Sequence, residues 1–237
     1  MPTVLLVRHG RTTANASGVL AGRTEGVELD ETGQTQAKGL ADRLAALPVS
    51  VIATSPQTRC RQTADAIAGV GGTKKVPRPD PVVDDRLAEC DYGEWTGRSL
   101  KDLAKESLWK VVQAHPSAAA FPGGESLRDM AARAVDAVRE LDRRVEQEHG
   151  PDALWVAVSH GDVIKSVLAD ALGMHLDSFQ RIVVDPCSVS VVRLTPMRPF
   201  VLRSNDTGGS IESLLPPRRK RRRRSVTSDA AVGGGAG

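Results

Sequence analysis

Two histidines in this sequence stand in the same local setting. His9 comes just after an apolar run over residues 3–7, His160 comes just after another over residues 154–158, and a glycine follows each histidine. Short continuous apolar runs are typical of strands that are buried on both faces. Ligands of open α/β sheets bind outside the carboxyl ends of the strands, so we expect both imidazoles to face one pocket.

Two arginines favour an anion in this predicted pocket. Arg8 precedes His9, and Arg59 lies in the first turn of a helix that Ser55 is expected to cap and Pro56 to begin. A helix start and two guanidinium groups fit a compact dianion such as phosphate. Taken singly, a histidine after a strand is more often structural, and a helix arginine is usually solvated. The combination favours a phosphate-binding active site.

The elements that must position these residues alternate between strands and helices. Besides the two apolar runs, we expect strands at 49–53, 82–83, 189–194 and 200–203, and helices at 32–47, 55–68, 99–113, 126–149 and 162–171. Such alternation predicts an α/β fold, a three-layer sandwich with a mostly parallel sheet and helices on both faces.

The net charge of +3 hides an uneven distribution. Residues 218–224 read RRKRRRR, whereas residues 1–217 include 25 basic and 28 acidic residues, a balance of −3. A basic face on the fold, which a nucleic-acid-binding domain needs, is therefore not predicted. The last segment holds too little apolar surface to offset its ordering entropy. We expect one catalytic domain over residues 1–206 and a disordered basic tail over residues 207–237.

Cysteine use and the N-terminus bear on metal binding and location. Cys60, Cys90 and Cys187 are odd in number and widely spaced, which argues against a disulfide framework or a zinc site and for a reducing compartment. Cys60 and Cys90 adjoin Arg59 and Glu89, but unpaired cysteines are more often small buried residues than redox switches. The N-terminus resembles neither a signal peptide nor a membrane span. We expect a cytoplasmic protein without a metal ion or cofactor.

Beyond these patterns, the segment LLVRHGRTTANASGVLAG resembles the opening signature of the histidine phosphatase superfamily, in its phosphoglycerate-mutase-like branch. Four further segments resemble the family in the same order: SPQTRCRQTA (55–64), LAECDYGEWTG (87–97), GGES (123–126) and VSHGDVIKSVL (158–168). Asn205 and Asp206 resemble its closing segment. The resemblance spans residues 3 to 208, and several linked motifs in order are far more specific than one.

This resemblance implies a role for each residue of the predicted pocket. His9, held neutral, would attack phosphorus and form a phosphohistidine. Arg8, Arg59 and His160 would bind the phosphate oxygens as charge redistributes. Glu89 would protonate the leaving oxygen and then activate water, which requires a raised pKa.

The resemblance also assigns residues around these five. Asn15 and Gly22 match positions that contact the substrate phosphate. Glu125 is expected to orient a pocket group, although a glutamate at a helix start also has a simple dipole explanation. Arg11 stands where the family commonly has glutamate, and we expect it at the rim of the pocket.

The predicted activity is that of a phosphomonoesterase acting on a small phosphorylated metabolite. A phosphoglycerate-mutase-like phosphomutase is the alternative, but the short segment 98–122 and the Asp162-Val163 pair depart from the mutase pattern and favour hydrolysis. A non-catalytic binder of phosphorylated ligands is a third hypothesis, which the intact set of pocket residues opposes. In a fourth, the tail at 218–224 tethers the chain to a nucleic acid or an anionic membrane, with weak, salt-sensitive binding. The sequence makes no prediction of oligomeric state.

Overall fold

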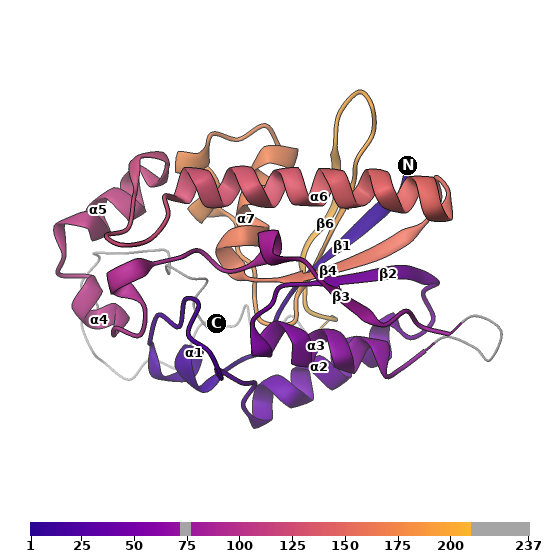
Figure 1. Cartoon of the computed structure of the whole chain (residues 1–237), viewed down its shortest axis with the longest axis horizontal. Helices are drawn as coiled ribbons and strands as arrows, with labels where there is room; N and C mark the ends of the chain where they lie inside the picture. The colour runs from indigo at the N-terminus through magenta and orange to yellow at the C-terminus, as the bar shows by residue number, and fades with distance from the viewer. Residues whose placement is uncertain (72–76, 210–237) are drawn as a thin grey trace.

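A six-stranded sheet forms the middle layer of the computed structural model, which describes residues 1–71 and 77–209 (Figure 1). The strands are β1 (Thr3–Arg8), β2 (Val49–Thr54), β3 (Pro81–Val83), β4 (Leu154–Ser159), β5 (Val189–Arg193) and β6 (Phe200–Asp206). They lie in the order β3-β2-β4-β1-β5-β6. The first four run parallel, while β5 and β6 pair antiparallel. The predicted mostly parallel sheet is confirmed.

Helices cover both faces of this sheet, which gives three layers (Figure 1). One face is covered by α2 (Glu31–Leu44) and α3 (Thr58–Ala68), the other by α6 (Leu127–His149) and α7 (Gly161–Ala171). Neighbouring residues of a strand point to opposite faces. In β1, Leu5 and Val7 pack with α2 and α3, whereas Val4 and Leu6 pack with α6 and α7. A strand buried on both faces must therefore be apolar throughout, as its sequence is.

The two central strands bring the chain's two predicted site histidines to one edge of the sheet. β1 and β4 are parallel neighbours, and their register pairs Arg8 with Ser159, the last residue of each strand. The N–H of His9 donates to the carbonyl of Ser159 at 3.0 Å. His9 and His160 thus leave the sheet side by side, as the sequence predicts.

Three helical segments differ from the sequence predictions. The start of α3 is at Thr58, and its N-cap is Gln57 rather than Ser55, so the predicted capping role of Ser55 is wrong. The side chain of Ser55 contacts His160 and Gln57 instead. A short helix, α1 (Thr13–Ser17), was not predicted, and the single helix expected at 99–113 is two helices, α4 (Leu100–Leu103) and α5 (Ser107–Ala114).

A long excursion between β3 and α6 forms one wall beside the histidines. It includes α4, α5 and the short 3-10 helices η1 (Asp85–Leu87), η2 (Gly93–Trp95) and η3 (Pro116–Ala118); a fourth, η4 (Leu176–Arg181), follows α7. The core of this excursion between β3 and α6 holds four of the chain's seven aromatic residues (Phe, Trp and Tyr). The rings of Tyr92 and Trp95 lie 4.9 and 5.3 Å from that of Phe121, and Trp109 stacks on Trp95. Aromatic packing therefore supports this wall.

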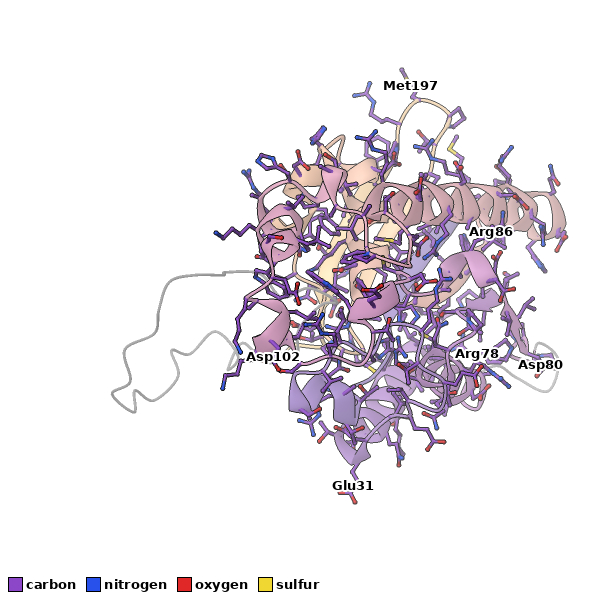
Figure 2. The ribbon with its side chains drawn as sticks, turned by 60° about the vertical axis from the view of Figure 1, so that its left-hand side comes forward. Glu31, Arg78, Asp80, Arg86, Asp102 and Met197 are labelled. Atoms are coloured by element: carbon purple, nitrogen blue, oxygen red, sulfur yellow. The ribbon has the colours of Figure 1, made fainter. Side chains whose placement is uncertain are left out.

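The C-terminal part of the described chain is a hairpin at the sheet edge. Met197 at its tip is 84% exposed and points away from the body of the protein (Figure 2). The predicted tail at 207–237 lies, from residue 210 onward, outside the described residues. Within the described part, no helix is both long and apolar enough to cross a bilayer.

Candidate active site

His9 is buried just beyond β1 and is held in one tautomer. Its Nδ1 lies 2.7 Å from the carbonyl oxygen of Gly10, which can only accept, so Nδ1 carries the proton. Nε of Arg59 donates to Nε2 of His9 at 3.2 Å, so Nε2 holds the lone pair. Burial, then the charges of Arg59 and Arg8, lower the pKa of His9 well below its usual value. The imidazole is therefore neutral, as a nucleophile must be.

The two arginines place donors around this lone pair. Arg59 is 2% exposed, and its Nη2 donates to the carbonyl of Gly22 at 2.8 Å. Its Nη1 is buried and has no hydrogen-bond partner among the residues that the structure describes. A buried donor without a partner is costly, and the oxygen of an anion would satisfy it. Arg8 is fully buried, and its Nη1 donates to the carbonyl of Val184 at 2.8 Å.

His160 closes the opposite side of the site. Its ring centroid lies 5.2 Å from that of His9. Nδ1 of His160 lies 3.2 Å from Nη2 of Arg59, while Nε2 lies 2.7 Å from Oγ of Ser55. Burial, then the positive charge of Arg59, lower the pKa of His160 well below its usual value. The site thus holds two neutral imidazoles beside two guanidinium groups.

Glu89 brings a carboxyl group to this cluster. The side chain is 4% exposed, and Oε2 lies 3.7 Å from Nδ1 of His160. Burial and the charge of Asp162 raise the pKa of Glu89 to about 7, against the opposing effect of Arg59. A carboxyl group with this pKa is present in both protonation states near neutrality, which suits a group that first gives and then takes a proton.

The main chain of Glu89 is held by residues that the sequence analysis did not select. Its carbonyl oxygen accepts from Nε of Arg23 at 2.9 Å and from Nη2 of Arg133 at 3.1 Å. Glu125 accepts from both guanidinium groups and from the N–H of Asp91. Glu125 therefore orients the segment around Glu89 through two arginines. No sequence pattern identifies Arg133 as a residue of the site, because an arginine on a helix is usually exposed to solvent.

The residues predicted around the core of the site lie in different settings. Oδ1 of Asn15 accepts from the N–H and the hydroxyl of Thr12, a capping box that begins α1. Gly22 has a φ of +52°, and a Cβ there would lie 2.7 Å from Oγ1 of Thr96, so glycine is required. Arg11 is paired with Asp30 at 2.8 Å, which offsets the extra positive charge expected at the rim.

The cysteines beside the site are free and buried. Sγ of Cys60 lies 3.4 Å from Nε2 of His160, and burial raises the pKa of Cys60 to about 12. Burial also raises the pKa of Cys90. Thiols that stay protonated are poor nucleophiles, so the interpretation as small packing residues fits better than a redox switch. Within residues 1–71 and 77–209, no group of three or more His, Cys, Asp and Glu residues is placed to hold a metal ion.

Comparison with known proteins places this geometry in a family. The sequence model of the histidine phosphatase superfamily (branch 1) matches residues 4–207. Phosphoserine phosphatase 1 of Hydrogenobacter thermophilus is 30% identical over 210 residues, which cover 87% of this chain and 93% of that protein. A protein of Cronobacter sakazakii named "Probable phosphoglycerate mutase GpmB" is 32% identical over 198 residues, 81% of this chain and 85% of that one.

Solved structures agree with this assignment. A mycobacterial glucosyl-3-phosphoglycerate phosphatase in complex with VO3 superposes with a TM-score of 0.74 at 28% identity, covering 86% of this chain and 98% of that one. YhfR of Bacillus stearothermophilus superposes with a TM-score of 0.76 at 26% identity, covering 87% and 98% of the two chains. The match to the family thus extends over nearly all of the described residues, and the chain belongs to branch 1 of the histidine phosphatase superfamily.

Proposed function

We propose that this chain is a phosphomonoesterase that hydrolyses a small phosphorylated metabolite through a phosphohistidine on His9. One observation carries the proposal: the lone pair of Nε2 of His9 lies in a buried site beside Arg59, whose Nη1 has no partner within the described residues. A phosphate group placed there would satisfy that donor and meet the nucleophile together.

The first half of the proposed reaction forms the covalent intermediate. Nε2 of His9 attacks phosphorus, and the bond from phosphorus to the ester oxygen breaks as the new N–P bond forms. Glu89 gives its proton to the departing oxygen, which leaves as an alcohol. Arg8, Arg59 and His160 bind the remaining phosphate oxygens as charge develops on them.

The second half restores the enzyme. A water molecule attacks phosphorus, and Glu89, now a carboxylate, accepts the proton of that water. The N–P bond breaks, inorganic phosphate leaves, and His9 is again neutral with its proton on Nδ1. A carboxyl group with a pKa of about 7 suits both halves, because neither of its protonation states is strongly disfavoured at neutral pH.

The substrate class follows from the general acid and from the relatives. A buried proton donor matters most for leaving groups of high pKa, such as the alkoxide of a sugar or a hydroxy acid. Relatives are named phosphoserine phosphatase and glucosyl-3-phosphoglycerate phosphatase. We propose that the substrate is an alkyl phosphate, the phosphate ester of a sugar or a hydroxy acid. A phosphomutase is the second candidate, since other relatives are named probable phosphoglycerate mutase; it would need a bisphosphate primer and would release little phosphate.

Four further parts of the proposal concern the molecule as a whole. Residues 1–206 would form the catalytic domain, and the basic tail would bind polyanions weakly without taking part in the chemical step. Catalysis would need no metal ion. The compartment would be the cytoplasm, where the three free cysteines stay reduced.

Phosphate release from a panel of substrates tests the proposal. The panel includes O-phosphoserine, 3-phosphoglycerate and p-nitrophenyl phosphate, each with and without a bisphosphate primer and excess chelator. We expect primer-independent, chelator-resistant release. His9→Ala should reduce kcat by about three orders of magnitude or more while leaving circular dichroism unchanged. Acid-labile labelling by a radioactive substrate should appear in the wild type alone; near-normal turnover of His9→Ala would refute the mechanism.

A further inference from the structure

Gln57 occupies a helix position that ordinarily belongs to another residue type. It is the N-cap of α3, where Ser, Thr, Asp or Asn normally accepts a hydrogen bond from the first helical turn. The Gln57 side chain makes no such bond. A residue that departs from the usual N-cap preference often lies at a functional position. Here the side chain of Gln57 contacts His160 in the active site.

The carboxamide oxygen of Gln57 is a shared acceptor. The N–H of Glu89 donates to Oε1 at 3.2 Å, and the hydroxyl of Ser55 donates to it at 2.5 Å. Nε2 of His160 lies 3.0 Å from the same atom. The N–H of Glu89 can only donate, so the atom that faces it must be the oxygen of the amide. One atom thus joins the segment of Glu89 to the ring of His160.

These contacts define the tautomer of His160. Oε1 can only accept, so Nε2 of His160 must carry the proton. The guanidinium of Arg59 can only donate, so Nδ1, at 3.2 Å from Nη2, must hold the lone pair. Because the hydroxyl of Ser55 is occupied by Gln57, Oγ of Ser55 is left to accept from His160. Without Oε1, that hydroxyl could turn and donate to Nε2, and both tautomers would be permitted.

We propose that Gln57 is a positioning residue that fixes the tautomer of His160 and the main chain of Glu89 through its single amide oxygen. It keeps Nδ1 of His160 facing the phosphate site, 3.7 Å from the carboxyl group of Glu89. When the phosphate dianion binds, its negative charge favours protonation of this nitrogen, which then donates to a phosphate oxygen. The inference rests on the proposed function, in which His160 binds the phosphate and Glu89 protonates the leaving oxygen. The inference adds Gln57, which contacts neither the substrate nor phosphorus but holds His160 and Glu89 in fixed positions relative to each other.

Two replacements at this position separate positioning from structure. Gln57→Met keeps the length of the side chain but removes the acceptor, whereas Gln57→Glu keeps an acceptor oxygen. We expect Gln57→Met to lose about 10- to 100-fold in kcat/KM on O-phosphoserine, since small misplacements of catalytic groups have effects of this size. Gln57→Glu should lose less activity than Gln57→Met because the acceptor remains, although its carboxyl group adds a like charge near Glu89. Gln57→Ser should lose activity like Gln57→Met while Tm stays the same or rises, because serine caps α3.

Gln62 on the same helix supplies a matched control. Its Oε1 accepts from the N–H of Leu29 at 2.8 Å, away from the catalytic groups. Gln62→Met should lower Tm and leave kcat/KM unchanged. A purely structural role for Gln57 would give this same pattern in Gln57→Met, with a lower Tm and an unchanged kcat/KM, and that result would overturn the proposal.

Two readouts report on the groups that Gln57 is proposed to hold. Gln57→Met should lose more activity on O-phosphoserine than on p-nitrophenyl phosphate, whose leaving group needs no proton from Glu89. Nitrogen chemical shifts of His160 should show a protonated Nε2 in the wild type and a tautomer mixture in Gln57→Met. An unchanged tautomer, or equal losses on both substrates in step with Tm, would overturn the proposal. The shifts need no turnover, so failure of the phosphohistidine chemistry remains distinguishable from failure of this inference.

Discussion

Glu89 is a carboxyl group whose ionisation is opposed by its surroundings. Burial removes it from water, and the charge of Asp162 adds to the effect, so its pKa rises from 4.5 to about 7. Arg8 and Arg59 stabilise the carboxylate only in part. The same burial keeps His9 and His160 neutral by lowering their pKa values. Low dielectric thus favours the protonation states that the proposed acid Glu89 and the proposed nucleophile His9 require.

A pH profile should report this ionisation. In the first half of the proposed reaction, Glu89 must be protonated and His9 neutral. The pKa of His9 lies well below 6.5, so His9 is neutral around pH 7. Because Glu89 loses its proton as pH rises through about 7, we expect kcat/KM on an alkyl phosphate to fall over this range. Glu89→Gln should lose about 100-fold or more on that substrate and far less on p-nitrophenyl phosphate. Equal losses on both substrates would mean that Glu89 is not the proton donor.

Ionisation of Glu89 should lower the free energy of unfolding, because its pKa is raised in the folded state. A folded-state pKa raised above the unfolded value contributes stability below pH 4.5, and this contribution disappears as pH rises through about 7. The Glu89→Gln variant has no ionisable group at this position, so its free energy of unfolding does not fall in this way as pH rises. We expect it to be more stable than the wild type at pH 8 by about 2–3 kcal/mol, with little difference at pH 4.5. Denaturant unfolding at both pH values measures this, and a pH-independent difference would contradict it.

At the scale of elements, the positions of strands could be predicted better than the starts of helices. β1 and β4 are recognisable because burial on both faces demands continuous apolar residues. The first turn of α3 was misplaced because Ser55 and Pro56 form a familiar capping pattern, while the contacts that prevail there come from His160. α1 has five residues and no buried side chain, so no periodicity marks it.

Arg78 shows how a distant residue completes a helix end. Its guanidinium donates to the carbonyl oxygens of Leu44, Leu47 and Val70, and so ties the end of α2 to the segment after α3 (Figure 2 labels Arg78). We expect Arg78→Ala to lower the free energy of unfolding by about 1–2 kcal/mol, because three carbonyls lose a donor. The exposed Arg61 is a matched control. Equal unfolding midpoints for Arg78→Ala and Arg61→Ala would show that these bonds contribute nothing measurable.

At the scale of the whole molecule, the site is assembled from segments far apart in the chain. His9 and His160 could be placed together from sequence, since parallel strands end at one edge. Glu89 comes from the excursion after β3 and was identified only through the family resemblance. Gln57, Arg23 and Arg133 were missed because their roles arise from contacts that form only when the segments pack. Local patterns carry information about strand ends but little about long-range hydrogen bonds.

The charge of the molecule is divided along its sequence, and this division leads to a last prediction. Seven consecutive positive charges occupy residues 218–224, and residues 1–217 carry a balance of −3. Strand β6 ends at Asp206, whose carboxylate accepts from Arg43 at 2.6 Å and from the N–H of Gly208 at 3.0 Å. Removing residues 210–237 keeps these contacts, so we expect unchanged Tm and unchanged kcat/KM on p-nitrophenyl phosphate.

Retention on heparin or DNA should respond very differently to this truncation. Full-length protein should bind at low salt with a log–log salt slope of roughly −6 at most, as seven phosphate contacts imply, and the truncated protein should not bind. Replacing the seven residues with glycine and serine at constant length is the matched control for chain length. Both kinetic constants are measured at low and high salt. A several-fold change in kcat/KM at high salt, where the charges of the tail are screened, would show that the tail belongs to the catalytic machinery.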